Sequence, residues 1–177
     1  MKTNYITILL FAGILLGCTN ERMKLLSEAE KVLPGNWRIE SVRLPKDGLG
    51  ITYQGNTFIA DTILFEVGSI EINNFSADTL PHLANHQHGK VKCNLTIGNE
   101  VFPIAITRLF ISGDEIFSGF EYNGPHGTFP INTDGEKFFW SSRIFNDNYI
   151  ITIINEDKVE LGKSNDRHDH VITLNRL

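Results

Sequence analysis

The sequence has few cysteines and no surplus of basic residues. Only Cys18 and Cys93 occur among its 177 residues, too few for the disulfide framework that stabilises many small secreted domains. Lysine and arginine together number 16, against 21 aspartates and glutamates, and the formal net charge is −5. Because an acidic chain without a basic run binds nucleic acid poorly, we expect no nucleic-acid partner.

Recognisable catalytic and cofactor motifs are also missing. The chain has no G-x-S-x-G, no H-E-x-x-H, no phosphate-binding loop and no dinucleotide fingerprint. The His-x-His pairs at 86–88 and 168–170 fall in polar loops, where side-chain direction is not fixed, and nothing nearby completes a metal site. We therefore predict no catalytic residue, no cofactor, no metal and no enzyme activity. An enzyme whose site is assembled from scattered residues is the third interpretation of this sequence.

The first eighteen residues carry the clearest signal. Lys2 gives a short positive region, and residues 5–16 form an apolar run that is too short for a bilayer-spanning helix of about 20 residues. The run ends in Gly17-Cys18 and resembles a bacterial lipobox. This resemblance implies cleavage before Cys18 and acylation of its thiol and new amino group. The alternatives are an ordinary signal peptide or a membrane anchor with an incidental cysteine.

The lipobox implies a location. We expect residues 1–17 to be the signal peptide and residues 18–24 to be the lipidated tether. Several acyl chains anchor a protein stably, whereas one chain does so only marginally. Since no aspartate follows Cys18, we expect a lipid-anchored protein of the bacterial cell envelope, sorted to the outer membrane, with the membrane as its first partner.

The remaining chain, residues 25–177, fits one domain. A chain of this size buries about 70% of its unfolded surface and needs no disulfide. Leu25, Leu26, Ala29, Val32 and Leu33 recur at helical spacing, which predicts a short amphipathic helix that ends at Pro34-Gly35. It is the only helix that we predict.

Everything after Gly35 has the pattern of strands and turns. The predicted strands cover residues 37–44, 62–75 (a hairpin turning near Gly68), 91–97, 101–111, 116–122, 137–145, 149–154, 158–161 and 171–177. Long loops are predicted at 45–61 and 77–89. Short turns cannot join parallel neighbours, so the nine or ten strands are mostly antiparallel. A closed barrel or a two-sheet sandwich would protect their edges.

The two ends of the domain favour the barrel. A short helix precedes Gly35-Asn36-Trp37, and the last strand ends in Leu174-Asn175-Arg176. This arrangement resembles the lipocalin family, above all the lipocalin-like lipoproteins of Bacteroidetes-type bacteria. The resemblance implies an all-β antiparallel lipocalin-like barrel with a short N-terminal helix. It also implies that Arg176 covers the Trp37 indole, a cation–π contact worth about 0.5–2 kcal/mol. The alternative is two unrelated residues.

The same resemblance implies an interior that holds a small apolar molecule. The candidate ligand-binding residues are aromatic or apolar and lie on later strands. Phe120 and Tyr122 share one face, and Phe138, Trp140 and Ile144 share another. Tyr122 and Trp140 would each offer a hydrogen-bonding group in an apolar pocket. The alternative is that these side chains only fill the core.

Two functions remain open. The first is a cell-envelope lipoprotein that binds a small apolar or amphipathic ligand non-covalently inside the barrel. The second is a protein-interaction or inhibitor module with a solid barrel, in which loops 45–61 and 77–89 contact another envelope protein.

Overall fold

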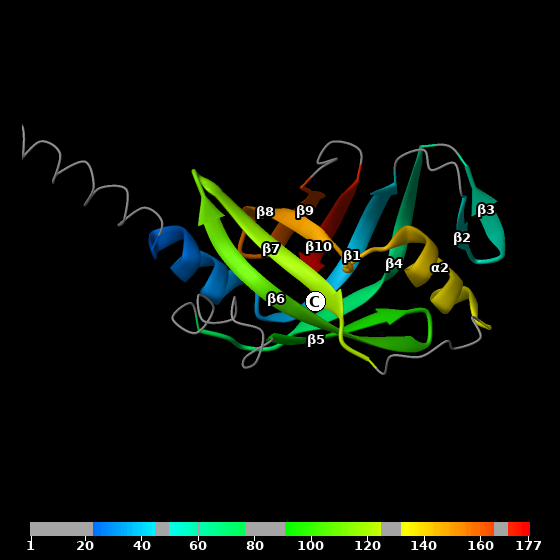
Figure 1. Ribbon diagram of the computed structural model, residues 1–177, viewed down its shortest axis with the longest axis horizontal. Helices are drawn as coiled ribbons and strands as arrows, with labels where there is room; N and C mark the ends of the chain where they lie inside the picture. The colour runs from blue at the N-terminus through cyan, green and yellow to red at the C-terminus, as the bar shows by residue number, and fades with distance from the viewer. Residues whose placement is uncertain (1–22, 45–49, 60, 77–90, 125–131, 165–169) are drawn as a thin grey trace, which may run out of the picture.

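The chain folds into a closed antiparallel barrel. The computed structural model describes residues 23–44, 50–59, 61–76, 91–124, 132–164 and 170–177. Eight strands close in the order β1-β10-β9-β8-β7-β6-β5-β4 (Figure 1). They are β1 (Gly35–Leu44), β4 (Thr62–Ile72), β5 (Val91–Ile97), β6 (Glu100–Ser112), β7 (Glu115–Tyr122), β8 (Asn148–Asn155), β9 (Lys158–Lys163) and β10 (Val171–Arg176). The all-β, antiparallel barrel predicted from the sequence is confirmed.

A helix over residues 23–32 lies at one end of the barrel (Figure 1). Its apolar residues recur at helical spacing, as the sequence predicted. Those that are buried or packed against the core are Leu25, Leu26, Ala29 and Val32. We call the barrel end that holds this helix the N-terminal end.

Alternation of apolar and polar residues places one face of each strand inside. In β5, the buried residues are Val91, Cys93, Leu95 and Ile97, and the exposed residues between them include Lys92 and Asn94. Successive strand residues point to opposite faces, so this strand contributes a continuous apolar row to the barrel interior. The sequence predicted this strand with the same bounds.

The hairpin predicted over residues 62–75 is wrong. The stretch contains a single strand, β4, which pairs with β1 over most of its length and with β5 from Gly68 onward. A Cβ atom on Gly68 would collide with the backbone carbonyl of Thr96. The glycine is therefore required because two strands approach closely, and not because the chain turns.

The long loop predicted over residues 45–61 contains a small hairpin. Strands β2 (Ile51–Tyr53) and β3 (Asn56–Phe58) pair in a separate two-stranded sheet. The turn residues Gln54 and Gly55 have φ angles of 48° and 76°. Positive φ at both central residues is the geometry of the tight hairpin turn whose twist matches that of the flanking strands.

The strand predicted over residues 137–145 is also wrong, because α2 (Asp134–Ser142) is a helix. The Thr133 side chain accepts a hydrogen bond from the Glu136 N–H, and the Glu136 carboxylate accepts one from the Thr133 N–H at 3.1 Å. This reciprocal capping box satisfies two of the helix's free N–H groups. Phe138, Phe139 and Trp140 favour a strand by intrinsic propensity. The capping box at the start of α2 favours a helix, and the helix forms.

Helix α2 lies at the barrel end opposite residues 23–32 (Figure 1). The Ser141 hydroxyl accepts a hydrogen bond of 3.3 Å from the Thr52 N–H of β2. A Cβ atom on Gly135 would lie 2.6 Å from a Glu100 carboxylate oxygen, so α2 begins beside the turn between β5 and β6. We call this end the α2 end. Neither helix in the described part of the chain is long and apolar enough to cross a bilayer.

Candidate functional site

The inward positions of the barrel carry large apolar side chains. Register places Trp37 of β1 opposite Ile70 of β4, which in turn lies opposite Leu95 of β5. The largest fully buried side chains are Trp37, Tyr149, Phe138, Phe139, Phe145, Leu33, Ile39, Leu44, Ile70, Leu95 and Ile97. These side chains occupy space that a ligand would need inside an eight-stranded barrel.

Three of the five predicted ligand-binding residues are buried in this core. Phe120, Phe138 and Ile144 are all buried. The Phe120 ring meets the Phe145 ring edge-on, with centroids 5.3 Å apart, and the Phe138 ring contacts Tyr53 at 4.8 Å. All three belong to the buried core. This agrees with the alternative that these side chains only fill the core.

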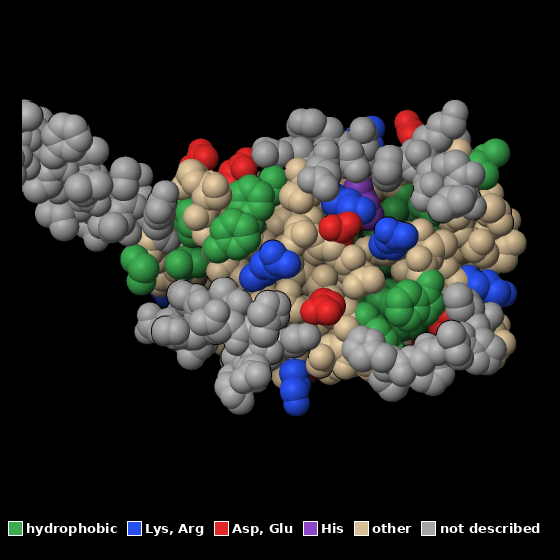
Figure 2. All heavy atoms as spheres, viewed as in Figure 1, with side chains coloured by type: hydrophobic (Ala, Val, Ile, Leu, Met, Phe, Trp, Pro, Cys, Tyr) green, Lys and Arg blue, Asp and Glu red, His purple; other side chains and the backbone are tan. Residues whose placement is uncertain are grey.

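The other two predicted residues meet at the surface of the α2 end. The Tyr122 and Trp140 rings pack edge-to-face with centroids 5.2 Å apart, and Trp140 remains 41% exposed. The sequence placed Trp140 on one strand face with Phe138. That placement is wrong, because on a helix residues two apart point in different directions. Figure 2 shows exposed apolar side chains at this end of the molecule.

The structural contact predicted at the N-terminal end is present. The Arg176 guanidinium lies 4.3 Å from the centroid of the Trp37 ring. Arg176 also donates to the carbonyls of Pro34, at 3.1 Å, and Val32. Gly35 has a φ of +127°, and a Cβ atom there would lie 2.7 Å from Arg176 Nη1, so glycine leaves room for the guanidinium.

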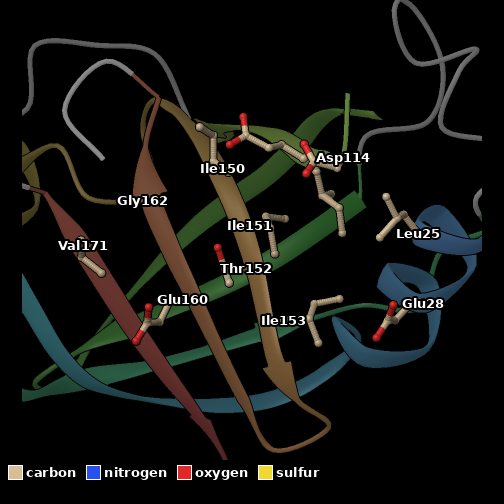
Figure 3. A pocket seen from close by; sticks show the side chains of 12 residues that line it. Leu25, Glu28, Asp114, Ile150, Ile151, Thr152, Ile153, Glu160, Gly162 and Val171 are labelled. Atoms are coloured by element: carbon tan, nitrogen blue, oxygen red, sulfur yellow. The ribbon is translucent and has the colours of Figure 1, made fainter. Parts of the chain in front are cut away.

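A cleft of about 430 Å³ opens in the barrel wall along β8, towards the N-terminal end, and residues of both strand faces line it; we call it the outer cleft. Strand β7 pairs with β8 only as far as Ile116 and Ile151, and β8 continues beyond its neighbour to Asn155. The cleft forms where β8 runs past the start of β7. In Figure 3, β8 crosses the middle, with β9 and β10 on one side and helix 23–32 on the other. The lining residues are Leu25, Glu28, Asp114, Glu115, Ile116, Ile150, Ile151, Thr152, Ile153, Glu160, Gly162 and Val171.

The outer floor of the cleft is apolar. Register aligns Ile150 with Gly162 and Gly162 with Val171 across β8, β9 and β10. The same row continues past the cleft, from Ile150 to Phe117 of β7 and then Phe110 of β6. Because Gly162 has no side chain, the floor is lowest between its two aliphatic neighbours. An apolar row on the outer face of a barrel is typical of a surface that binds a ligand or another molecule.

The rim of the cleft is acidic. Glu28, Asp114, Glu115 and Glu160 line it, and none of the described lining residues is a lysine, arginine or histidine. Figure 3 shows Asp114, Glu28 and Glu160 approaching from three directions. Within the described ranges, no group of three or more His, Cys, Asp or Glu side chains is placed to hold a metal ion. The arrangement can therefore offer apolar area and separated negative charges.

No predicted ligand-binding residue lines this cleft, and the sequence patterns did not predict it. A signal was nevertheless present. Residues 149–154 are apolar at both alternating positions, apart from Thr152, which is more than a strand with one solvated face requires. Such a run marks a strand with something packed on its outer side.

Other titratable or polar groups lie in the core. Burial raises the pKa of the Cys93 thiol to about 12, so Cys93 is a protonated, buried side chain and not a nucleophile. Burial also raises the pKa of Tyr149. His170 is buried, whereas His86, His88, His168 and the predicted lipid-attachment residue Cys18 lie outside the described residues.

The lipocalin-like assignment rests on the barrel, on the Trp37–Arg176 contact and on the sequence pattern, and it stays a prediction. Comparison of the chain with protein-family models, curated proteins and solved structures finds no match.

Proposed function

We propose that this protein is a lipoprotein of the bacterial cell envelope that binds a small apolar or amphipathic molecule non-covalently. We place the ligand in the outer cleft, in contrast to the interior site expected from the sequence. The cleft carries this proposal: its volume of about 430 Å³ falls in the range of small-molecule sites, which are mostly apolar with a few polar groups. Binding there requires no chemistry, and we propose none.

The position of the cleft supports a membrane-linked role. Leu25, in the cleft wall, is seven residues after Cys18. Seven residues span at most about 25 Å when extended. If Cys18 is acylated, the cleft stays within that distance of the membrane surface, where amphipathic molecules concentrate. We propose the outer membrane as that surface, on the absence of aspartate after Cys18.

Native mass spectrometry tests the ligand. The protein is extracted gently from its own cells and measured under native and then denaturing conditions. We expect a small mass that is lost on denaturation, and that is absent in Gly162→Leu, where a side chain fills the lowest part of the floor. Thr96→Leu is the matched control, since Thr96 faces outward on β5, away from the cleft.

Two results would overturn the placement. Retention of the ligand in Gly162→Leu would exclude the outer cleft. Its loss only in Tyr122→Ala and Trp140→Ala would move the site to the α2 end.

The lipid anchor is tested separately by Cys18→Ala. We expect the variant to keep its circular dichroism spectrum and to leave the membrane fraction, because the domain core lies after residue 24. Unchanged membrane fractionation would contradict the lipoprotein assignment and leave the ligand proposal intact.

A protein-interaction function is the second candidate, and the α2 end favours it. Trp140 is 41% exposed and packs against Tyr122 and Phe139. Aromatic side chains presented on a packed support are typical interface anchors. A co-purifying envelope protein that is retained by Gly162→Leu and lost in Trp140→Ala would establish this function in place of the first.

A further inference from the structure

We infer that the ligand of the outer cleft is a cationic amphiphile, an alkyl chain that carries an ammonium group. This inference rests on the proposed function and specifies the class of molecule. It follows from the charges around the cleft, the chemistry of its floor and the distance between them.

The carboxylates of the cleft come from separate elements of the fold. Glu28 lies on helix 23–32, Asp114 in the turn between β6 and β7, and Glu160 on β9. None of these three forms an ion pair with a described residue. Elsewhere on the surface, acidic residues do have basic partners, as in Asp147–Lys163, Glu40–Lys158 and Asp134–Lys137. Among the described residues, these three carboxylates of the cleft therefore have no basic partner.

A metal ion does not fit this distribution. Metal ions need several oxygen ligands converging at about 2.0–2.6 Å, and no described group of acidic side chains converges in this way. An organic cation has looser requirements, because its charge is spread over a larger group and is attracted without coordination. An anionic molecule would be repelled from the same rim.

The apolar floor begins next to the charges. Glu160 and Gly162 are two residues apart on β9 and point to the same outer face, about 7 Å from each other. From Val171 the floor runs over Gly162 to Ile150, two strand spacings or about 10 Å. A ligand with its ammonium beside Glu160 and Thr152 would lay its alkyl chain over Gly162. A molecule with only an ammonium group would contact the carboxylates alone, and a molecule with only an alkyl chain would contact the apolar floor alone.

The experiment compares three probes with the same short chain: hexyltrimethylammonium, hexyl glucoside and hexyl sulfate. The protein, as its own cells process it, is placed in zwitterionic nanodiscs with isoleucine methyl groups labelled for NMR. Shifts of the Ile150 and Ile153 signals report binding in the cleft, and empty nanodiscs correct for partitioning. We expect the cation to bind about tenfold more tightly than the glucoside, which corresponds to about 1.4 kcal/mol, and the sulfate to bind least.

Substitutions then isolate the charge. Glu160→Gln removes one partly exposed negative charge and should weaken binding of the cation about three- to fivefold, with no change for the glucoside. Glu71→Gln makes the same change on the outer face of β4, outside the cleft, and should alter neither. Because the whole chain is acidic, this control separates the cleft from the general field of the protein.

The outcomes separate the two proposals. If no probe moves the Ile150 and Ile153 signals, the proposed binding function of the cleft fails. If the glucoside or the sulfate binds as tightly as the cation, or if Glu160→Gln and Glu71→Gln weaken the cation equally, the cationic ligand is overturned and the proposed function stands.

Discussion

The two ends of the barrel are closed by different kinds of interaction. At the N-terminal end, Arg176 from the last strand reaches back to the chain ahead of the first strand. It stacks on Trp37 and donates to the carbonyls of Val32 and Pro34, which lie 144 and 142 residues earlier. The Trp37 indole N–H donates to the Leu33 carbonyl at 2.8 Å. These polar, directional contacts add to the apolar packing of helix 23–32 against the core.

The α2 end is closed by aromatic packing. Phe139 of α2 stacks on Phe102 of β6 with ring centroids 4.7 Å apart, and it also contacts Tyr122 and Trp140. Phe138, beside it, is fully buried as well. This closure depends on apolar area, which is non-directional and scales with the surface removed from water.

The two closures contribute differently: one mainly to the stability of the fold, the other mainly to the position of helix 23–32. Burial of two phenylalanine side chains contributes more free energy than a few partly exposed hydrogen bonds. The polar contacts at the other end fix where helix 23–32 sits, and that helix forms one wall of the outer cleft. We therefore expect damage at the α2 end to cost mainly stability, and damage at the N-terminal end to cost less stability but more binding.

The largest effect is expected for Phe139→Ala. Removal of a fully buried phenylalanine leaves a cavity and lowers the free energy of unfolding by about 3–5 kcal/mol. Urea denaturation measures the loss. Phe110→Ala is the matched control, because Phe110 is 47% exposed and should cost clearly less. Equal losses in the two variants would show that α2 is not a tightly packed closure.

Arg176→Ala should have the second largest effect. The variant loses the cation–π contact and three hydrogen bonds from the guanidinium to the carbonyls of Val32, Pro34 and Glu156. Because these contacts are partly exposed, we expect a loss of about 2–3 kcal/mol. Arg176→Lys keeps the charge without the planar fork of donors, so it should recover only part of the loss. Arg38→Ala, on the exposed face of β1, should change the free energy of unfolding by less than about 0.5 kcal/mol.

The same pair of variants tests the comparison directly. Arg176→Ala should weaken hexyltrimethylammonium binding to the cleft, because the helix wall is no longer held. Phe139→Ala, measured where it is still folded, should leave that binding unchanged. A Phe139→Ala variant that loses binding while Arg176→Ala retains it would reverse our assignment of roles to the two ends.

The sequence predicts the N-terminal end better than the α2 end. Alternation of apolar and polar residues identifies strands such as β5, and the Gly35-x-Trp37 opening with the terminal Arg176 identifies the neighbours that close the barrel. At the α2 end, residues 137–145 were predicted as a strand because their aromatic residues suit one. The pattern that favours a helix there is the Thr133-x-x-Glu136 capping box, a short signal that only two residues carry.

The outer cleft was not predictable in the same way. Its lining comes from helix 23–32, the β6–β7 turn and strands β7 to β10, so no local pattern describes it. It depends on β8 extending beyond the start of β7, which is a matter of register between strands. Sequence periodicity gives the face of each residue, but the relative length and offset of two neighbouring strands come from the assembled barrel.

The smallest effect concerns pH and again separates the two ends. At the α2 end, burial raises the pKa of Asp147, but the hydrogen bond and charge of Lys163, together with the Asn148 N–H, outweigh it and hold the pKa below its usual value. The Lys163 ammonium lies 2.7 Å from the Asp147 carboxylate. At the N-terminal end, the main partners of Arg176 are neutral carbonyls and an indole ring.

Acid should therefore weaken the Asp147–Lys163 contact at the α2 end. A carboxyl group with a lowered folded-state pKa stabilises the fold above its unfolded pKa of about 3.9, and this contribution is lost as the pH falls through the folded pKa. Asp147→Asn should lower stability by less than about 1 kcal/mol at pH 7, since the pair is partly exposed. The difference from the unmodified protein should shrink below pH 4. The loss from Arg176→Ala should change little over the same range, because the main partners of Arg176 are neutral. A parallel decrease in the two losses would contradict this distinction between the two ends of the barrel.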